Sequence, residues 1–137
     1  MASEPVHVVP LQIYYEDTDL SGSVYHANYL RYFERAREHL LGPEELVRLW
    51  GVEGIGFVVY RCELAFREPA GLGDRLEVRT QVKLESDYRA VFAQSVWRPG
   101  GKQAMVEGTV QLVCVNRENK LVPLPPTVRA RISDPEA

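Results

Sequence analysis

The sequence has few of the features that direct a chain to membranes, to nucleic acid or to an oxidising compartment. Its 137 residues contain no apolar run of membrane-spanning length. Residues 1–10 lack the pattern of a signal peptide. The formal net charge of -3 gives no electrostatic reason to propose a nucleic acid or an anionic membrane as a partner. We therefore expect a cytoplasmic protein without an integral membrane segment.

Cysteines and nucleotide-binding motifs are also scarce. The two cysteines, Cys62 and Cys114, lie in apolar strand patterns outside any CxxC pair, so we interpret them as reduced core residues. No GxGxxG or P-loop pattern occurs, which argues against a Rossmann or Walker nucleotide site. His26 is the only histidine close to a group of carboxylates, and no second ligand cluster accompanies it. We therefore expect no metal ion and no cofactor.

The most informative stretch of the chain is residues 14–41, YYEDTDLSGSVYHANYLRYFERAREHLL. Its first part is a polar turn rich in carboxylates, and its second part repeats apolar residues at helical spacing, which predicts a helix over roughly residues 27–41. The apolar positions are Tyr29, Leu30, Phe33, Ala36, Leu40 and Leu41. Carboxylates and an imidazole thus lie just ahead of a helix N-terminus, where free N–H groups stabilise an oxygen that gains negative charge.

Period-two alternation predicts strands on both sides of this helix. A first strand is expected over residues 8–15, with Leu11, Ile13 and Tyr15 on one face. Four more strands follow from residue 57 onward, joined by short loops that favour antiparallel neighbours. In the first of these four strands, every second residue is apolar, which predicts one apolar face: Val58, Tyr60, Cys62, Leu64 and Phe66.

This order of elements predicts an α+β fold for the single domain that we expect over residues 1–137. The expected architecture is a curved antiparallel β-sheet of about five strands packed on one long α-helix. One helix can hardly cover such a sheet. The apolar surface left over, around Val91, Ala93 and Trp97, therefore predicts a homodimer or a higher homo-oligomer.

The motif over residues 14–37 is specific enough to resemble a known family. It closely resembles the signature of hotdog-fold acyl-CoA thioesterases in the 4-hydroxybenzoyl-CoA thioesterase family, most of all the branch associated with the bacterial Tol-Pal envelope system. The resemblance continues more loosely through the strands to the VPLPP tail. It implies a hotdog fold, with the sheet wrapped around the long helix, and an acyl-CoA substrate. It also implies three catalytic residues: Asp19, His26 and Tyr15.

The chemistry of thioester hydrolysis is compatible with these residues. Asp19, ionised at neutral pH, is the general base toward water or, alternatively, the nucleophile that forms a mixed anhydride. Backbone N–H groups over residues 25–27 would stabilise the oxyanion. His26 would hold the thioester or protonate the leaving thiolate. From spacing alone, Asp19 is a turn or capping residue and Tyr15 a core residue; the resemblance favours the catalytic reading of both.

Several features stay open at this stage. The tyrosines at 25, 29 and 32 either line an acyl pocket or belong to the core, and Asp17 is expected to have a structural role. Candidates to bind the phosphates of coenzyme A are Arg61, Arg67, Arg79, Lys83 and Arg89. The acyl chain can be short, long or aromatic. The alternative function is a non-catalytic module that binds acyl thioesters or acyl carrier protein. An acyl-thioester dehydratase is disfavoured, because its HxxxFPG-like motif is absent.

Overall fold

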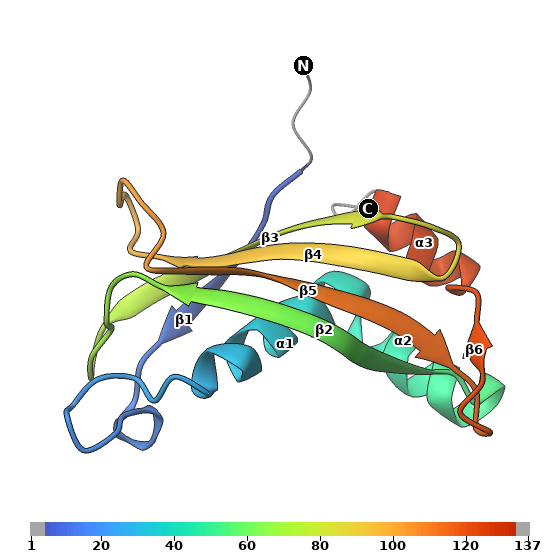
Figure 1. Cartoon of the computed structure of the whole chain (residues 1–137), viewed down its shortest axis with the longest axis horizontal. Helices are drawn as coiled ribbons and strands as arrows, with labels where there is room; N and C mark the ends of the chain where they lie inside the picture. The colour runs from blue at the N-terminus through green and yellow to red at the C-terminus, as the bar shows by residue number, and fades with distance from the viewer. Residues whose placement is uncertain (1–4, 134–137) are drawn as a thin grey trace.

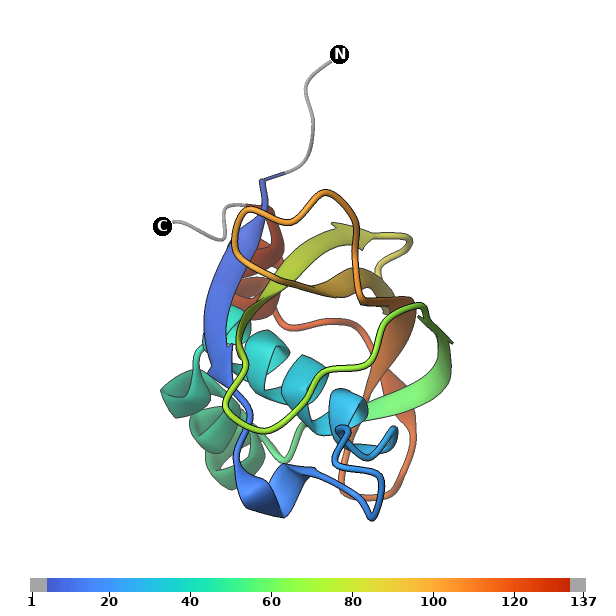
Figure 2. The ribbon, with the colours of Figure 1, turned by 90° about the vertical axis from the view of Figure 1, so that its left-hand side faces the viewer.

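A computed structural model describes residues 5–133 of the chain. An antiparallel sheet curves around a long helix (Figure 1), and the view along that helix shows it enclosed between strand β1 on one side and strand β2 on the other (Figure 2). The strand order is β1-β3-β4-β5-β2, and the short β6 pairs with β5. The elements are β1 (His7–Gln12), η1 (Tyr15–Asp17), α1 (Asn28–Leu41), α2 (Pro43–Arg48), η2 (Leu49–Glu53), β2 (Gly56–Phe66), β3 (Arg75–Leu84), β4 (Arg89–Trp97), β5 (Val106–Val115), β6 (Leu121–Val122) and α3 (Pro126–Ser133).

The predicted α+β architecture is confirmed. All strand pairs are antiparallel, and β4, which has two largely apolar faces in the sequence, is the central strand of the sheet. The long helix matches the predicted range to within one residue. None of the helices within residues 5–133 has the length and the apolar character needed to cross a membrane.

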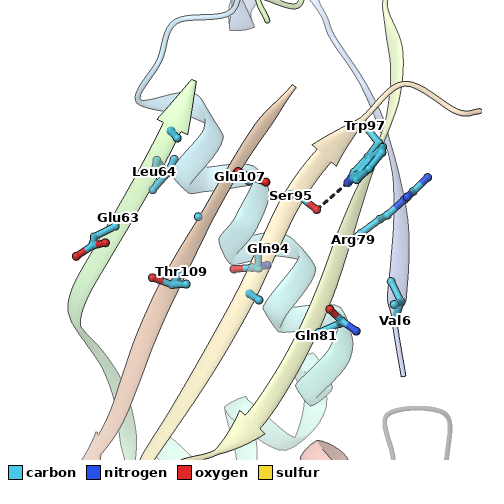
Figure 3. Close-up of a pocket in the computed structure, with 13 residues that line it drawn as sticks. Val6, Glu63, Leu64, Arg79, Gln81, Gln94, Ser95, Trp97, Glu107 and Thr109 are labelled. Carbon is cyan, nitrogen blue, oxygen red and sulfur yellow. Dashed lines mark hydrogen bonds between the residues drawn. The ribbon is translucent and has the colours of Figure 1, made fainter. Parts of the chain in front are cut away.

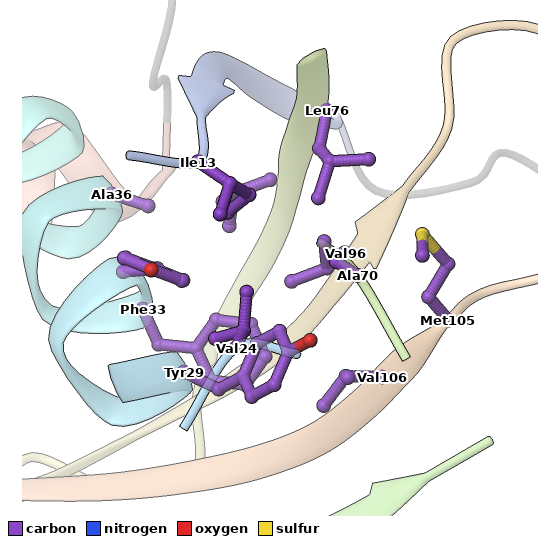
Figure 4. Close-up of a cluster of buried hydrophobic side chains, with 12 residues drawn as sticks. Ile13, Val24, Tyr29, Phe33, Ala36, Ala70, Leu76, Val96, Met105 and Val106 are labelled. Atoms are coloured by element: carbon purple, nitrogen blue, oxygen red, sulfur yellow. The ribbon is translucent and has the colours of Figure 1, made fainter. Parts of the chain in front are cut away.

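Helix α1 fills the inside of the curved sheet. It ends at Gly42, whose φ of 92° suits glycine and whose N–H donates to the carbonyl of Glu38. Its buried face joins two clusters of apolar side chains, one of which surrounds Phe33 (Figure 4) and the other Leu40. One predicted core position, Leu30, is exposed, while Tyr32 is buried in its place. The apolar stripe is thus rotated slightly from the one expected.

A buried polar network ties the middle of α1 to the sheet. The Nη1 of Arg37 donates to Gln94 Oε1 at 3.0 Å. Gln94 Nε2 in turn donates to the carbonyl of Phe33 and to Thr80 Oγ1, both at 3.0 Å. The side chains of Arg37, Gln94 and Thr80 are all buried. Each hydrogen bond among them therefore replaces one that the polar group would make with water in the unfolded chain.

The first strand is shorter than predicted, and Tyr15 is not a core residue. Strand β1 ends at Gln12, and the side chain of Tyr15 is 81% exposed, whereas Ile13 is fully buried. The chain turns because the carboxylate of Asp17 accepts a hydrogen bond from the N–H of Tyr14 and closes the short helix η1. A local side-chain bond therefore interrupts the alternation before it reaches Tyr15.

The predicted alternation of β2 is also interrupted. The register with β5 shifts between Val59 and Arg61, so Val59 pairs with Leu112 and Arg61 with Gln111. The irregularity turns Tyr60 to the outer face of the sheet, where its hydroxyl bonds to Gln111. The side chains of residues 62, 64 and 66 lie on the inner face. The expectation of one continuous apolar face is wrong for this reason.

Strand β2 also exposes one of the two cysteines. It forms an edge of the sheet, and most of its side chains are exposed on both faces. Cys62 lies on this strand and is exposed, so its assignment to the core is wrong, whereas Cys114 on β5 is buried as expected. Both thiols are free.

Candidate active site

Asp17 connects the turn after β1 to the start of α1. Besides binding the N–H of Tyr14 through its side chain, it accepts two hydrogen bonds at its backbone carbonyl. The donors are the N–H of Tyr25 and the side-chain amide of Asn28, each at 2.9 Å. Asp17 therefore has the structural role expected from its position, and it fixes the loop between itself and the helix.

Asp19 lies at the start of a tight turn within that loop. The N–H of Asp19 donates to Ser23 at 2.8 Å and the N–H of Gly22 donates back to Asp19 at 3.0 Å. The turn needs glycine at residue 22, where φ is 84°. The carboxylate Oδ1 of Asp19 accepts hydrogen bonds from Ser21, from its N–H at 2.9 Å and from its hydroxyl at 2.6 Å.

These hydrogen bonds determine the charge of Asp19. The hydroxyl of Ser21 first, and then its N–H, lower the pKa of the Asp19 carboxyl below its ordinary value, and His26 adds a smaller effect in the same direction. The carboxylate is thus ionised at neutral pH and exposed. The backbone of Ser23 acts on the carboxylate in the same direction, and the two hydrogen bonds of full geometry within residues 5–133 both go to Oδ1. The geometry is that of a turn residue with one carboxylate oxygen left available.

Two backbone N–H groups are available at the start of α1. The sequence analysis expects the N–H groups of residues 25–27 to be available to an oxyanion. The N–H of Tyr25 instead donates to the carbonyl of Asp17. The N–H groups of His26 and Ala27 make no hydrogen bond to the described part of the chain. The following three N–H groups bond to carbonyls three residues earlier: Asn28, Tyr29 and Leu30. Among the first N–H groups of α1 and its leading loop, the two at residues 26 and 27 are therefore left without a partner in the described structure.

His26 lines a pocket of about 270 Å³ between the loop and the end of β2. Its ring centroid lies 4.6 Å from that of Tyr25 and 6.3 Å from that of Phe66. Tyr29, Arg67 and Glu68 also line the pocket, so its walls combine aromatic rings with one cation and one carboxylate. Neither Asp19 nor Tyr15 is among the lining residues of the protomer. The structure thus brings His26 to a cavity and leaves Asp19 on the adjoining exposed turn.

The basic residues proposed for the phosphates of coenzyme A differ in their surroundings. Four of the five form ion pairs with neighbouring glutamates: Arg61 with Glu63, Arg67 with Glu107, Arg79 with Glu77 and Arg89 with Glu85. Lys83 forms no ion pair within the described residues. Of the five, Arg67 alone lines the pocket of His26. The others lie on strand positions away from that pocket.

A larger cavity, of about 610 Å³, lies elsewhere. It is a hollow on the outer face of the sheet, and α1 runs behind the strands that form it (Figure 3). Arg79 stacks over the ring of Trp97 at its rim, 4.0 Å from the centroid. None of the three predicted catalytic residues lines it, so size alone does not identify the site. Within residues 5–133, no group of three or more metal-ligating side chains could hold a metal ion.

A sequence model of the thioesterase-like superfamily matches residues 14–132. The chain belongs to this superfamily. It is therefore a thioester hydrolase with the hotdog fold. The match covers the loop of Asp19 and His26, the helix that follows and nearly the whole sheet.

Individual relatives agree with this membership. The acyl-CoA thioester hydrolase YbgC of Escherichia coli O157:H7 is 34% identical over 108 residues, which cover 78% of this chain and 80% of the relative. The acyl-CoA thioesterase YbgC of Haemophilus influenzae is 35% identical over 124 residues, covering 88% and 90%. Among solved structures, a 1,4-dihydroxy-2-naphthoyl-CoA thioesterase from Synechocystis superposes with a TM-score of 0.87 at 26% identity, covering 95% of this chain and 97% of its own.

Sequence reasoning missed two residues of this region. Ser21 bonds to Asp19, and a serine two residues after an aspartate is a recognisable turn signal that could have indicated it. Phe66 faces His26 from a strand 40 positions further along the chain. No local pattern could indicate that contact, because it depends on how the loop packs against β2.

Proposed function

We propose that the protein hydrolyses acyl-CoA thioesters to the free acid and coenzyme A, with Asp19 as the general base. The observation that carries the proposal is an ionised carboxylate with one available oxygen on the turn that leads to two available helix N–H groups. Water would lose a proton to Asp19 as it attacks the carbonyl carbon. The membership of the chain in the thioesterase-like superfamily supports this reaction.

The start of α1 would act as the oxyanion hole in this scheme. The carbonyl oxygen gains negative charge when water adds, and the N–H groups of His26 and Ala27 are the donors that can receive it. When the tetrahedral intermediate collapses, the carbon–sulfur bond breaks and the thiolate of coenzyme A leaves. The proton held by Asp19 would then pass to solvent or to that thiolate. Direct attack by Asp19, through a mixed anhydride, is the mechanistic alternative.

His26 and Tyr15 have supporting roles in the proposal. The imidazole of His26 lines the aromatic pocket and can hold the thioester or give a proton to the departing thiolate. Tyr15 lies on the exposed turn before Asp17, outside the pocket of the protomer. Its role in lining the site rests on the family resemblance. Arg67 is the basic residue best located to contact a phosphate of coenzyme A.

The proposal includes a second copy of the chain. Strand β2, beside the pocket of His26, is an edge strand with exposed apolar side chains on both faces. A partner copy along this edge would cover them and add walls to a site that is open in the protomer. A dimer and a tetramer both satisfy this requirement. Binding of acyl carrier protein and a cytoplasmic location stay predictions.

The test of the proposed function is thiol release from a panel of short, long and aromatic acyl-CoAs. Wild-type protein should release thiol, and Asp19→Asn should lower kcat by about 10²–10⁴-fold, the usual contribution of a general base. Asp19→Asn keeps an oxygen that can accept the bonds of Ser21, so the fold should persist. Similar rates for both proteins would remove Asp19 from the mechanism. Binding of acyl-CoA or acyl carrier protein without any turnover would support the non-catalytic module instead.

A further inference from the structure

Strand β2 leaves a continuous stretch of exposed side chains along one edge of the sheet. From Val58 to Phe66 every side chain is exposed except that of Leu64, which is half-buried. Within residues 5–133, β2 pairs only with β5, so its other side has no neighbouring strand. Cys62 is the midpoint of this stretch. An antiparallel strand centred on Cys62 would therefore cover all of it.

The charges at the middle of β2 are complementary to themselves. Arg61 and Glu63 flank Cys62, form an ion pair of 2.6 Å within the protomer and are both more than 60% exposed. Glu63 lies on the outer face of the sheet (Figure 3), and Arg61, which contacts it, lies there as well. A two-fold axis through Cys62 would place Arg61 of each copy opposite Glu63 of the other. Opposite charges at facing positions stabilise an antiparallel pair.

The same charges disfavour the neighbouring alignments. Facing residues of antiparallel strands lie on the same face of the sheet, so a two-fold pairing of β2 with itself is centred on a residue. A centre at residue 61 would place Arg61 opposite its own copy, and a centre at residue 63 would do the same with Glu63. Like charges at facing positions are destabilising. Of the three centres, Cys62 is the one that avoids this repulsion.

We propose that two copies of the chain pair antiparallel along β2 with Cys62 at the two-fold axis. This inference rests on the proposed function, which includes a second copy, and it specifies how that copy meets the site. Counted through the register shift of β2, Phe66 falls beside the partner's Phe57 and the partner's Val58. Phe66 is a wall of the pocket of His26. The start of the partner's β2 would therefore extend the wall of that pocket.

The alignment is tested by joining the two Cys62 thiols. Facing residues of an antiparallel pair have Cα atoms about 4.5–5.5 Å apart, within the range of a disulfide. Wild-type protein is refolded from urea with diamide, which takes up the two thiol hydrogens, and should give a covalent dimer on a non-reducing gel. Cys114→Ser should give the same dimer, because Cys114 is buried.

A variant with the thiol moved along the strand is the matched control for the alignment. It combines Cys62→Ser with Ala65→Cys, at an exposed position of β2. A thiol at residue 65 would lie about 20 Å from its copy in the proposed pairing, so this variant should give no covalent dimer. Absence of the wild-type covalent dimer, or equal cross-linking of the control, would overturn the alignment.

The facing charges provide a second measurement, the mass in solution by light scattering. Arg61→Glu would place glutamates opposite each other at two symmetric positions and should lower the mass toward that of one chain. Adding Glu63→Arg restores opposite charges and should restore the wild-type mass. Arg79→Glu is the control, because it breaks an ion pair of the same spacing with Glu77 on β3, and its mass should not fall to that of one chain. An Arg61→Glu variant with the wild-type mass would contradict the proposed alignment.

Neither readout depends on catalysis, so the two proposals can fail separately. If Cys62 forms the covalent dimer and no acyl-CoA is hydrolysed, the alignment stands and the proposed function fails. If the protein releases thiol from acyl-CoA while Cys62 does not join its copy, the proposed function stands and the alignment fails.

Discussion

Ser21 is the residue that controls the ionisation of Asp19. Its hydroxyl and N–H both donate to one carboxylate oxygen and lower the pKa of Asp19 below its ordinary value. Ser21→Ala removes the larger of these two effects, so the pKa of Asp19 should rise. A general base must be deprotonated to act, so the acidic limb of the kcat/KM profile should move to higher pH, with little change at neutral pH.

The measurement is the pH dependence of thiol release between about pH 3 and pH 7, the range in which a carboxyl group titrates. Ser23→Ala is the control, because Ser23 contacts Asp19 through its backbone groups, which alanine retains. An acidic limb that stays in place in Ser21→Ala, or that moves equally in Ser23→Ala, would contradict the role of the Ser21 hydroxyl. A stability effect alone would not move the limb in the folded enzyme.

At the scale of strands and helices, the sequence predicted the order, the pairing direction and the long helix, because these follow from apolar periodicity. It could not predict where periodicity is interrupted. Strand β1 stops early because Asp17 captures a backbone N–H, and β2 shifts its register between Val59 and Arg61. The first depends on one side-chain hydrogen bond and the second on one extra residue in β2, and period-two alternation indicates neither. The catalytic assignment of Asp19 came from family resemblance, since its geometry alone is that of a turn residue.

Gly108 allows β5 and β2 to approach each other closely. A Cβ at this position would lie 2.1 Å from the backbone carbonyl oxygen of Glu63, which cannot move without disturbing the strand pair. Gly108→Ala should therefore destabilise the protein by about 1–3 kcal/mol, the usual cost of overpacking. Urea denaturation followed by circular dichroism measures the free energy of unfolding.

Gly51→Ala is the matched control for this prediction. A Cβ at Gly51 would meet no atom within 4 Å, and its backbone conformation needs no glycine. Both substitutions reduce the entropy of the unfolded chain in the same way. The difference between them therefore isolates the contact with Glu63. Equal stabilities of the two variants would show that β2 and β5 can separate at little cost.

For the whole molecule, the sheet has two edge strands of different character. Strands β1 and β2 are the two outermost strands of the sheet. Of the two, β2 exposes apolar side chains on both of its faces. Val58, Val59, Tyr60 and Phe66 are each at least 40% exposed. An edge of this kind is a template for pairing with another chain unless it is covered. The open pocket of His26 adjoins it, so the assembly and the active site should depend on each other.

We expect the protein in solution to have at least twice the mass of one chain, as measured by light scattering coupled to size-exclusion chromatography. Val59→Lys places a charge on the exposed β2 edge and should shift the protein toward the monomer, with a parallel loss of thiol release. Val8→Lys is the control, since Val8 is similarly exposed on the β1 edge and should leave mass and activity unchanged. A fully active monomeric Val59→Lys would contradict a site that is completed by the partner copy. A wild-type monomer would contradict the assembly itself.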